Sequence, residues 1–143
     1  MTRILTIIAI LFATPVNAFD RIVNILGDGS DPMHTSYILK RCGVISFSMA
    51  ENFRLRGKSE ETPIVEIMNQ RAVTFIYFGR ELELSHSKGV TEEQHQNQLS
   101  LIGKMYVAEM EKHWANTGNK ISKNIESDLA SCTELYKMLE NAE

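Results

Sequence analysis

Two Glu-x-x-His patterns are the clearest candidates for chemistry in this sequence. Glu83 and His86 form the first pattern, and Glu92 and His95 form the second. On a helix this spacing places both side chains on one face, one turn apart, and di-metal carboxylate bundles use it twice. A hairpin between the two patterns would bring both copies to the same level. The sequence therefore offers the hypothesis of a transition-metal site at this turn, to which His34 would add a further ligand.

The same residues also fit a site without metal. Both patterns border a loop between expected helices, where polar side chains are common, and short combinations of Glu and His recur by chance. Di-metal sites also take a carboxylate from each remaining helix, and here those helices carry Glu51 and Glu126 at the opposite end. We therefore expect no cofactor and keep metal binding as the alternative.

Sequence motifs for catalysis are not found. The chain lacks a G-x-S-x-G nucleophile elbow, a G-x-x-x-x-G-K-[ST] phosphate loop and an H-E-x-x-H metal helix. It also lacks a C-x-x-C pair, which argues against a thioredoxin-like redox site. We expect a protein that is not an enzyme.

The two cysteines, Cys42 and Cys132, are separated by ninety positions. In an oxidising compartment, two cysteines in a small domain most simply form one disulfide. Two alternatives stay open: both thiols are free and buried as small hydrophobic groups, or each cysteine pairs with another chain. The internal disulfide is the prediction, and it would leave no thiolate for nucleophilic catalysis.

The N-terminal segment predicts that the protein is exported. Arg3 supplies a positive start, Ile4–Ala13 is a largely apolar run, and Val16 and Ala18 are small residues of the kind that signal peptidase requires. This run is about half of the roughly 20 residues that a membrane-spanning helix needs. The alternatives are a buried core helix and an uncleaved membrane anchor. We expect a cleaved signal peptide at 1–18, which would leave 19–143 as one domain, periplasmic or extracellular.

Composition and charge limit the class of partner. The 143 residues are 43% hydrophobic and 23% charged, and the formal net charge is −3. A mildly acidic chain without a long basic stripe is a poor candidate for binding nucleic acid or an anionic membrane. We therefore expect an unknown protein or a small apolar ligand, bound at a helical surface or groove. The second expected helix has two apolar sides, which also makes a homo-oligomer possible.

The sequence predicts four helices, each with a recognisable start. Residues 31–32 (Asp-Pro) and 62–63 (Thr-Pro) each place a polar cap before a proline, which suits the first turn of a helix. Residues 91–94 (Thr-Glu-Glu-Gln) fit a capping box. The fourth helix covers 121–139, where apolar residues recur at steps of three and four. By contrast, residues 19–25 are expected to form an extended lead-in.

The second helix contains one ambiguous stretch. Residues 72–78 (AVTFIYF) would pass for a buried strand if they were taken alone. The flanking segments, however, have helical composition and carry no turn signal. We therefore expect one helix from Pro63 to Lys88, after a first helix that ends near Gly57.

Four helices joined by short loops predict an all-α fold, an antiparallel up-down-up-down four-helix bundle. In that topology the first and fourth helices are adjacent and antiparallel. Cys42 and Cys132 both lie near the middle of their helices, on the apolar side. The bundle would therefore bring them within the roughly 7 Å between Cα atoms that a disulfide needs, and the bond would tie the first helix to the fourth.

Overall fold

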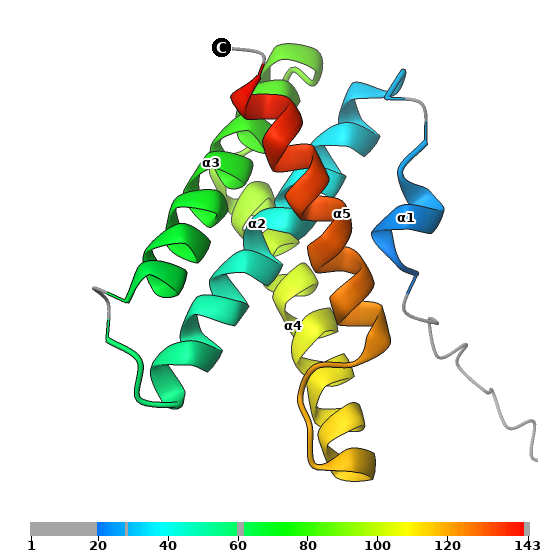
Figure 1. The fold of residues 1–143 in the computed structure, drawn as a ribbon. Coiled ribbons are helices and arrows are strands. Elements are labelled where there is room, and N and C mark those ends of the chain that lie inside the picture. The colour runs from blue at the N-terminus through cyan, green and yellow to red at the C-terminus, as the bar shows by residue number, and fades with distance from the viewer. Residues whose placement is uncertain (1–19, 28, 60–61, 142–143) are drawn as a thin grey trace, which may run out of the picture.

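A computed structural model describes residues 20–27, 29–59 and 62–141. This part of the chain forms helices and no β-strand, so the all-α prediction is confirmed. The helices are α1 (Ile22–Ile25), α2 (Pro32–Leu55), α3 (Pro63–His86), α4 (Glu92–Thr117) and α5 (Lys123–Glu140) (Figure 1). Among these helices, none is both long and apolar enough to cross a membrane. The predicted signal peptide, 1–18, lies outside the described residues.

The long helices begin where their caps predict. Asp31 accepts hydrogen bonds from two backbone N–H groups in the first turn of α2. Thr91 and Gln94 form the reciprocal capping box at the start of α4. Ser122 caps α5, so this helix begins at Lys123, two residues after the predicted start. The starts of α2 and α4 depend on local hydrogen bonds, which is why the sequence alone was enough to place them.

The N-terminal lead-in differs from its prediction. Residues 22–25 form the short helix α1, so the expectation of an extended segment there is wrong. The side chain of Ile22 is fully buried, and its N–H donates a hydrogen bond of 2.7 Å to Asp128 Oδ1. A single helical turn is not stable by itself, so tertiary contacts determine its conformation. The ambiguous residues 72–78 are helical, as predicted.

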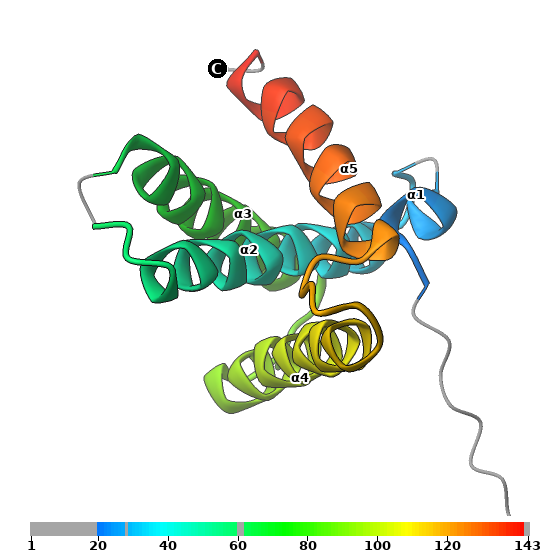
Figure 2. The ribbon, with the colours of Figure 1, turned by 60° about the horizontal axis from the view of Figure 1, so that its bottom comes forward.

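Helix α2 lies at the centre of the fold. It contacts α3, α4 and α5, and Figure 2 shows α4 on one side of it and α5 on the other. In an up-down-up-down bundle the first and third helices lie on a diagonal, whereas here Lys40 Nζ donates to Gln98 Oε1 at 2.6 Å and thereby joins α2 to α4. The helical class is established, but these contacts do not establish the predicted four-helix bundle arrangement.

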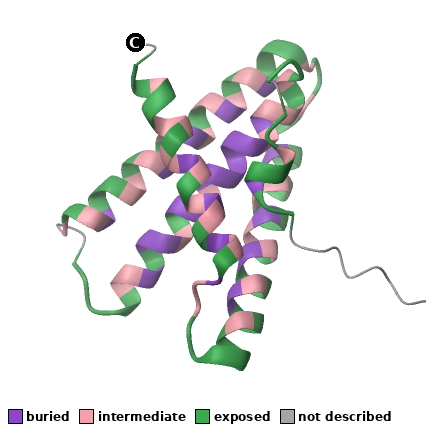
Figure 3. Cartoon of the chain, turned by 45° about the vertical axis from the view of Figure 1, so that its right-hand side comes forward, coloured by how far each residue is buried: buried purple, intermediate pink, exposed green. Residues whose placement is uncertain are grey.

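The hydrophobic core surrounds the middle of α2. Figure 3 shows that buried residues gather where the helices meet and that the outer faces are exposed. The core takes side chains from α1, α2, α3, α4 and α5, among them Ile22, Ile38, Ile45, Met49, Phe75, Ile102, Tyr106 and Ile125.

Two glycines allow α2 and α3 to approach closely. At Gly43 of α2, a Cβ atom would lie 2.5 Å from Ile76 Cγ1 and 3.1 Å from the carbonyl oxygen of Ala72. At Gly79 of α3, it would lie 3.1 Å from the carbonyl oxygen of Ser36. The Ser36 hydroxyl donates a hydrogen bond of 2.6 Å to the Gly79 carbonyl oxygen. A side chain at either position would push the two helices apart.

Gly43→Ala is expected to lower the free energy of unfolding by about 1–3 kcal/mol, because the new methyl group overlaps Ile76 and the α3 backbone. Urea unfolding followed by circular dichroism measures this change. Gly103→Ala in α4 is the matched control, since the nearest heavy atom to a Cβ there is 3.9 Å away. That variant should be neutral or stabilised by up to about 1 kcal/mol. Equal destabilisation of the two variants would contradict the close contact.

Candidate functional site

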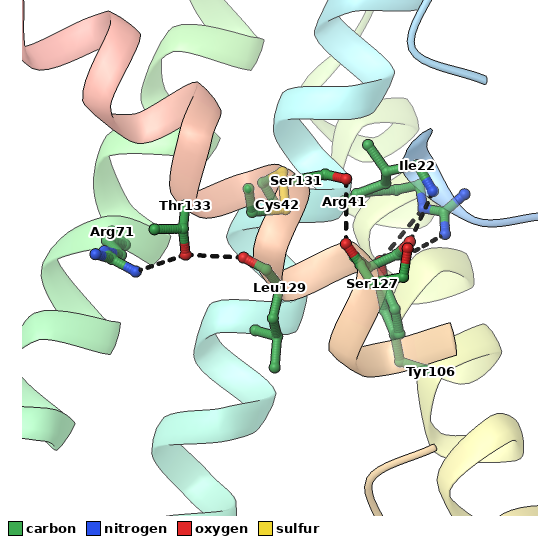
Figure 4. The surroundings of a disulfide bond; sticks show 11 residues. Ile22, Arg41, Cys42, Arg71, Tyr106, Ser127, Leu129, Ser131 and Thr133 are labelled. Atoms are coloured by element: carbon green, nitrogen blue, oxygen red, sulfur yellow. Dashed lines mark hydrogen bonds and ion pairs between the residues drawn. A yellow bond between two sulfur atoms is a disulfide. The ribbon is translucent and has the colours of Figure 1, made fainter. Parts of the chain in front are cut away.

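Cys42 and Cys132 form a disulfide in the core, as predicted (Figure 4). Their Cα atoms are 5.4 Å apart, and the two residues are 0% and 3% exposed. The bond joins the middle of α2 to the middle of α5. Both sulfurs are oxidised and buried, so the pair holds the two helices together and provides no thiolate nucleophile.

A buried ion pair lies beside the disulfide. Arg41 Nη2 is 2.6 Å from Asp128 Oδ2, and the two residues are 1% and 0% exposed. Asp128 also accepts hydrogen bonds from the hydroxyl of Tyr106 (2.6 Å) and the N–H of Ile22 (2.7 Å). Arg41 Nη1 donates to the carbonyl oxygen of Asp20 at 2.8 Å. This cluster joins α1, α2, α4 and α5 at one point (Figure 4).

Electrostatic interactions within this cluster determine the protonation states of Arg41 and Tyr106. Burial alone would lower the pKa of Arg41, but the Tyr106 oxygen and the Asp128 carboxylate outweigh burial and raise the pKa. For Tyr106, burial and then the Asp128 carboxylate raise the pKa. Arg41 therefore stays charged and Tyr106 stays a neutral donor at physiological pH. Groups that do not change protonation near neutral pH are poorly suited to general acid–base catalysis.

A second buried network surrounds Glu83. Its Oε1 atom is 2.6 Å from Lys40 Nζ. Its Oε2 atom accepts a hydrogen bond from Arg80 Nη1 at 2.9 Å and lies 3.2 Å from His95 Nδ1. Lys40, Glu83 and His95 are all less than 5% exposed. The network therefore joins α2, α3 and α4, on a different side of α2 from the Arg41 cluster.

The structure brings two of the five predicted metal ligands into contact, Glu83 and His95. The other three have different partners: Glu92 interacts with side chains at the surface, His86 with a carbonyl oxygen of its own helix, and His34 with a carbonyl oxygen of α1. Within the described residues, no group of three or more His, Cys, Asp or Glu side chains is arranged to hold a metal ion.

Two cations occupy the space next to Glu83. Lys40 and Arg80 both donate to its carboxylate, and their positive charges repel a metal cation. At this turn, Glu83 from the first Glu-x-x-His pattern and His95 from the second take part in an ion-pair network. Metal binding stays a prediction, which elemental analysis of protein purified without a histidine tag tests, before and after loading with zinc or iron.

We expect stability to fall in acid as Glu83 becomes protonated. Burial by itself would raise the pKa of Glu83, but hydrogen bonds from Lys40 and Arg80 outweigh burial and lower the pKa. Because the pKa is lower in the folded protein, the contribution of Glu83 is complete above about pH 4.3 and is lost as pH falls through the folded pKa. Urea unfolding between neutral and acidic pH measures the loss. Glu83→Gln should make the acid side of the profile less steep, and Glu111→Gln, exposed on α4, should leave it unchanged.

Sequence reasoning missed Lys40, Arg41 and Asp128. A signal was present, since Lys40 and Arg41 interrupt the middle of a largely apolar helix. Asp128 likewise lies three residues after Ile125 and four before Cys132, on the apolar face of its helix. A carboxylate and two cations at such positions indicate buried ion pairs, because isolated buried charges are very unfavourable.

An apolar pocket lies between the start of α2 and the end of α5. Its volume is about 320 Å³. It is lined by Leu26, Gly27, Gly29, Thr35, Ile38, Leu39, Leu135 and Met138. None of these residues is charged, and the Thr35 hydroxyl already donates to the carbonyl oxygen of Asp31 at 2.9 Å. The pocket therefore suits a neutral, apolar group.

No protein-family model, curated protein or solved structure matches this chain.

Proposed function

We propose that the protein is an exported, non-catalytic binding protein that holds a small neutral apolar ligand in the pocket between α2 and α5. The lining of the pocket carries this proposal, because the described residues that line it are mainly hydrophobic and none of them is charged. Ligand pockets usually have volumes of about 300–1,000 Å³. At about 320 Å³, this pocket is at the small end of that range and suits a correspondingly small ligand.

The walls of the pocket adjoin the buried ion pairs and the disulfide of the core. On α2, Leu39 lies directly before Lys40 and Arg41, whose buried ion pairs fix this segment. On α5, Leu135 lies three residues after Cys132, whose disulfide joins the two helices. A site that is already in its bound shape loses less conformational freedom on binding. This preorganisation supports ligand binding as the role of the disulfide-linked core.

The proposal includes two further expectations, which concern export of the protein and the order of its helices. Export is supported by the predicted signal peptide at 1–18 and by the disulfide, since disulfides persist in oxidising compartments. The antiparallel up-down-up-down order of α2, α3, α4 and α5 is supported by the short connections between consecutive helices.

Binding of 1-aminoanthracene, a neutral fluorescent probe, tests the proposed function. Its fluorescence should rise saturably with protein and fall again when decan-1-ol displaces it. Leu135→Trp should weaken probe binding by at least about tenfold, because the larger side chain fills the pocket. Leu101→Trp, on the exposed outer side of α4, is the matched control and should bind like the wild-type protein. The absence of a saturable signal, or equal binding by the two variants, would count against the proposal.

Self-association through α3 is the second candidate role. Its outer face exposes Val73 (70%), Tyr77 (58%) and Leu84 (49%), which share one side of the helix at steps of four and seven. Sedimentation velocity over a range of concentrations tests this role. A dimer that Tyr77→Glu abolishes and Leu101→Glu leaves intact would support it, whereas a monomer at all concentrations would exclude it.

A further inference from the structure

A polar hollow lies on another face of α5. Its volume is about 270 Å³, and it shares no lining residue with the apolar pocket. On α3 it is lined by side chains at steps of four, and on α5 by side chains of the last two turns: Gln70, Thr74, Phe78, Tyr136, Leu139 and Glu140. The hollow is therefore a groove between one face of α3 and one face of α5.

The polar groups of this hollow are available to a ligand. Among the described residues, the side chains of Gln70, Thr74 and Glu140 and the hydroxyl of Tyr136 make no hydrogen bond to the protein. The amide and the two hydroxyls can both donate and accept, and the carboxylate accepts. Several such groups around one hollow are what fixes the orientation of a polar ligand in a binding site.

Charge around the hollow disfavours ionic ligands of either sign. The carboxylates of Glu140 in the hollow and of Glu66 in the depression that adjoins it repel an anion. The guanidinium of Arg71 lies over the Tyr136 ring, 5.1 Å from its centroid, so it repels a cation and already occupies that position over the ring. The ligand class that fits this balance is neutral and rich in hydroxyl groups. Phe78 adds an apolar surface against which the C–H face of a sugar ring can pack.

The hollow continues along α3. A more open depression of about 450 Å³ is lined by Glu66, Asn69, Gln70, Val73 and Thr74. It shares Gln70 and Thr74 with the polar hollow, so the two form one cleft. We propose that this cleft binds a neutral saccharide, with one ring between α3 and α5 and a second ring along α3.

Two-dimensional ¹H–¹⁵N NMR titration of the whole folded protein tests this proposal, with maltose, cellobiose and N-acetylglucosamine as probes. At least one of them should give saturable shifts at the backbone amides of Gln70, Thr74 and Tyr136. Thr74→Val keeps the side-chain shape and removes the hydroxyl, and Glu140→Gln removes the charge. Each should weaken binding by about tenfold, a reduction typical of losing one well-made polar contact. Glu111→Gln, an exposed change on α4, is the control and should leave binding unaltered.

Three results would overturn the saccharide site. These are no saturable shift with any of the three sugars, binding that neither Thr74→Val nor Glu140→Gln weakens, and tighter binding of ethylamine or acetate than of the sugars. Leu135→Trp separates this site from the apolar pocket. Sugar binding that survives Leu135→Trp while the binding of 1-aminoanthracene is lost would support two independent sites.

Discussion

Replacing Cys42 and Cys132 together by alanine is expected to lower the free energy of unfolding by about 4–5 kcal/mol. The bond connects residues 90 positions apart, and in the chain-entropy model its loss gives the unfolded chain much greater freedom. Domains of this size are typically stable by about 5–15 kcal/mol. The variant should therefore be only marginally folded. Urea unfolding followed by circular dichroism measures the difference from the oxidised wild-type protein.

The reduced wild-type protein is the matched control for the double alanine variant. Reduction opens the same loop but leaves both sulfur atoms in the core, so it separates the effect of the crosslink from the loss of buried side chains. Both samples should unfold at similar urea concentrations, well below that of the oxidised protein. Free-thiol titration of unfolded, unreduced protein should detect no thiol. Two reactive thiols per chain would contradict the disulfide, and a midpoint that reductant does not move would contradict its stabilising role.

Asp128→Asn is expected to lower the free energy of unfolding by about 3–5 kcal/mol, the usual cost of removing one partner from a buried ion pair. Asparagine keeps the size of the side chain and can still accept from the N–H of Ile22, but it removes the charge that balances Arg41. A guanidinium keeps its proton at any ordinary pH, so Arg41 cannot escape the imbalance by becoming neutral. A full charge would remain in the core, where α1, α2, α4 and α5 meet.

A double-mutant cycle separates the charge from the packing. Arg41→Met combined with Asp128→Asn removes both charges and keeps an acceptor for Ile22 and Tyr106, so the double variant should recover part of the stability that Asp128→Asn alone loses. Glu126→Gln, an exposed change in the first turn of α5, is the control and should alter stability by no more than about 0.5 kcal/mol. If Asp128→Asn lowers the free energy of unfolding no more than Glu126→Gln does, the buried cluster does not stabilise the fold as described.

The candidate site could be predicted only in part. Glu83 and His95 were identified from their spacing, and they do meet across α3 and α4. The spacing could not show that they belong to an ion-pair network, because the cations that bind Glu83 are Lys40 from α2 and Arg80 from its own helix. The polar cleft was not predicted at all. Its residues on α3 and α5 carry no motif, and they line one hollow because of how the two helices lie.

The sequence by itself determined where α2 and α4 begin, since their caps Asp31 and Thr91 act through hydrogen bonds within one turn. It also indicated the disulfide, because two cysteines in a small domain have few other partners. By contrast, the position of α2 at the centre of the fold depends on tertiary contacts and could not be predicted from the sequence. Gly43 and Gly79 let α3 approach α2 closely. The Arg41–Asp128 ion pair then joins α5 to α2, and the hydrogen bond from Lys40 to Gln98 joins α4 to α2. Such contacts depend on how helices cross, which is not set by the spacing of residues along any one helix.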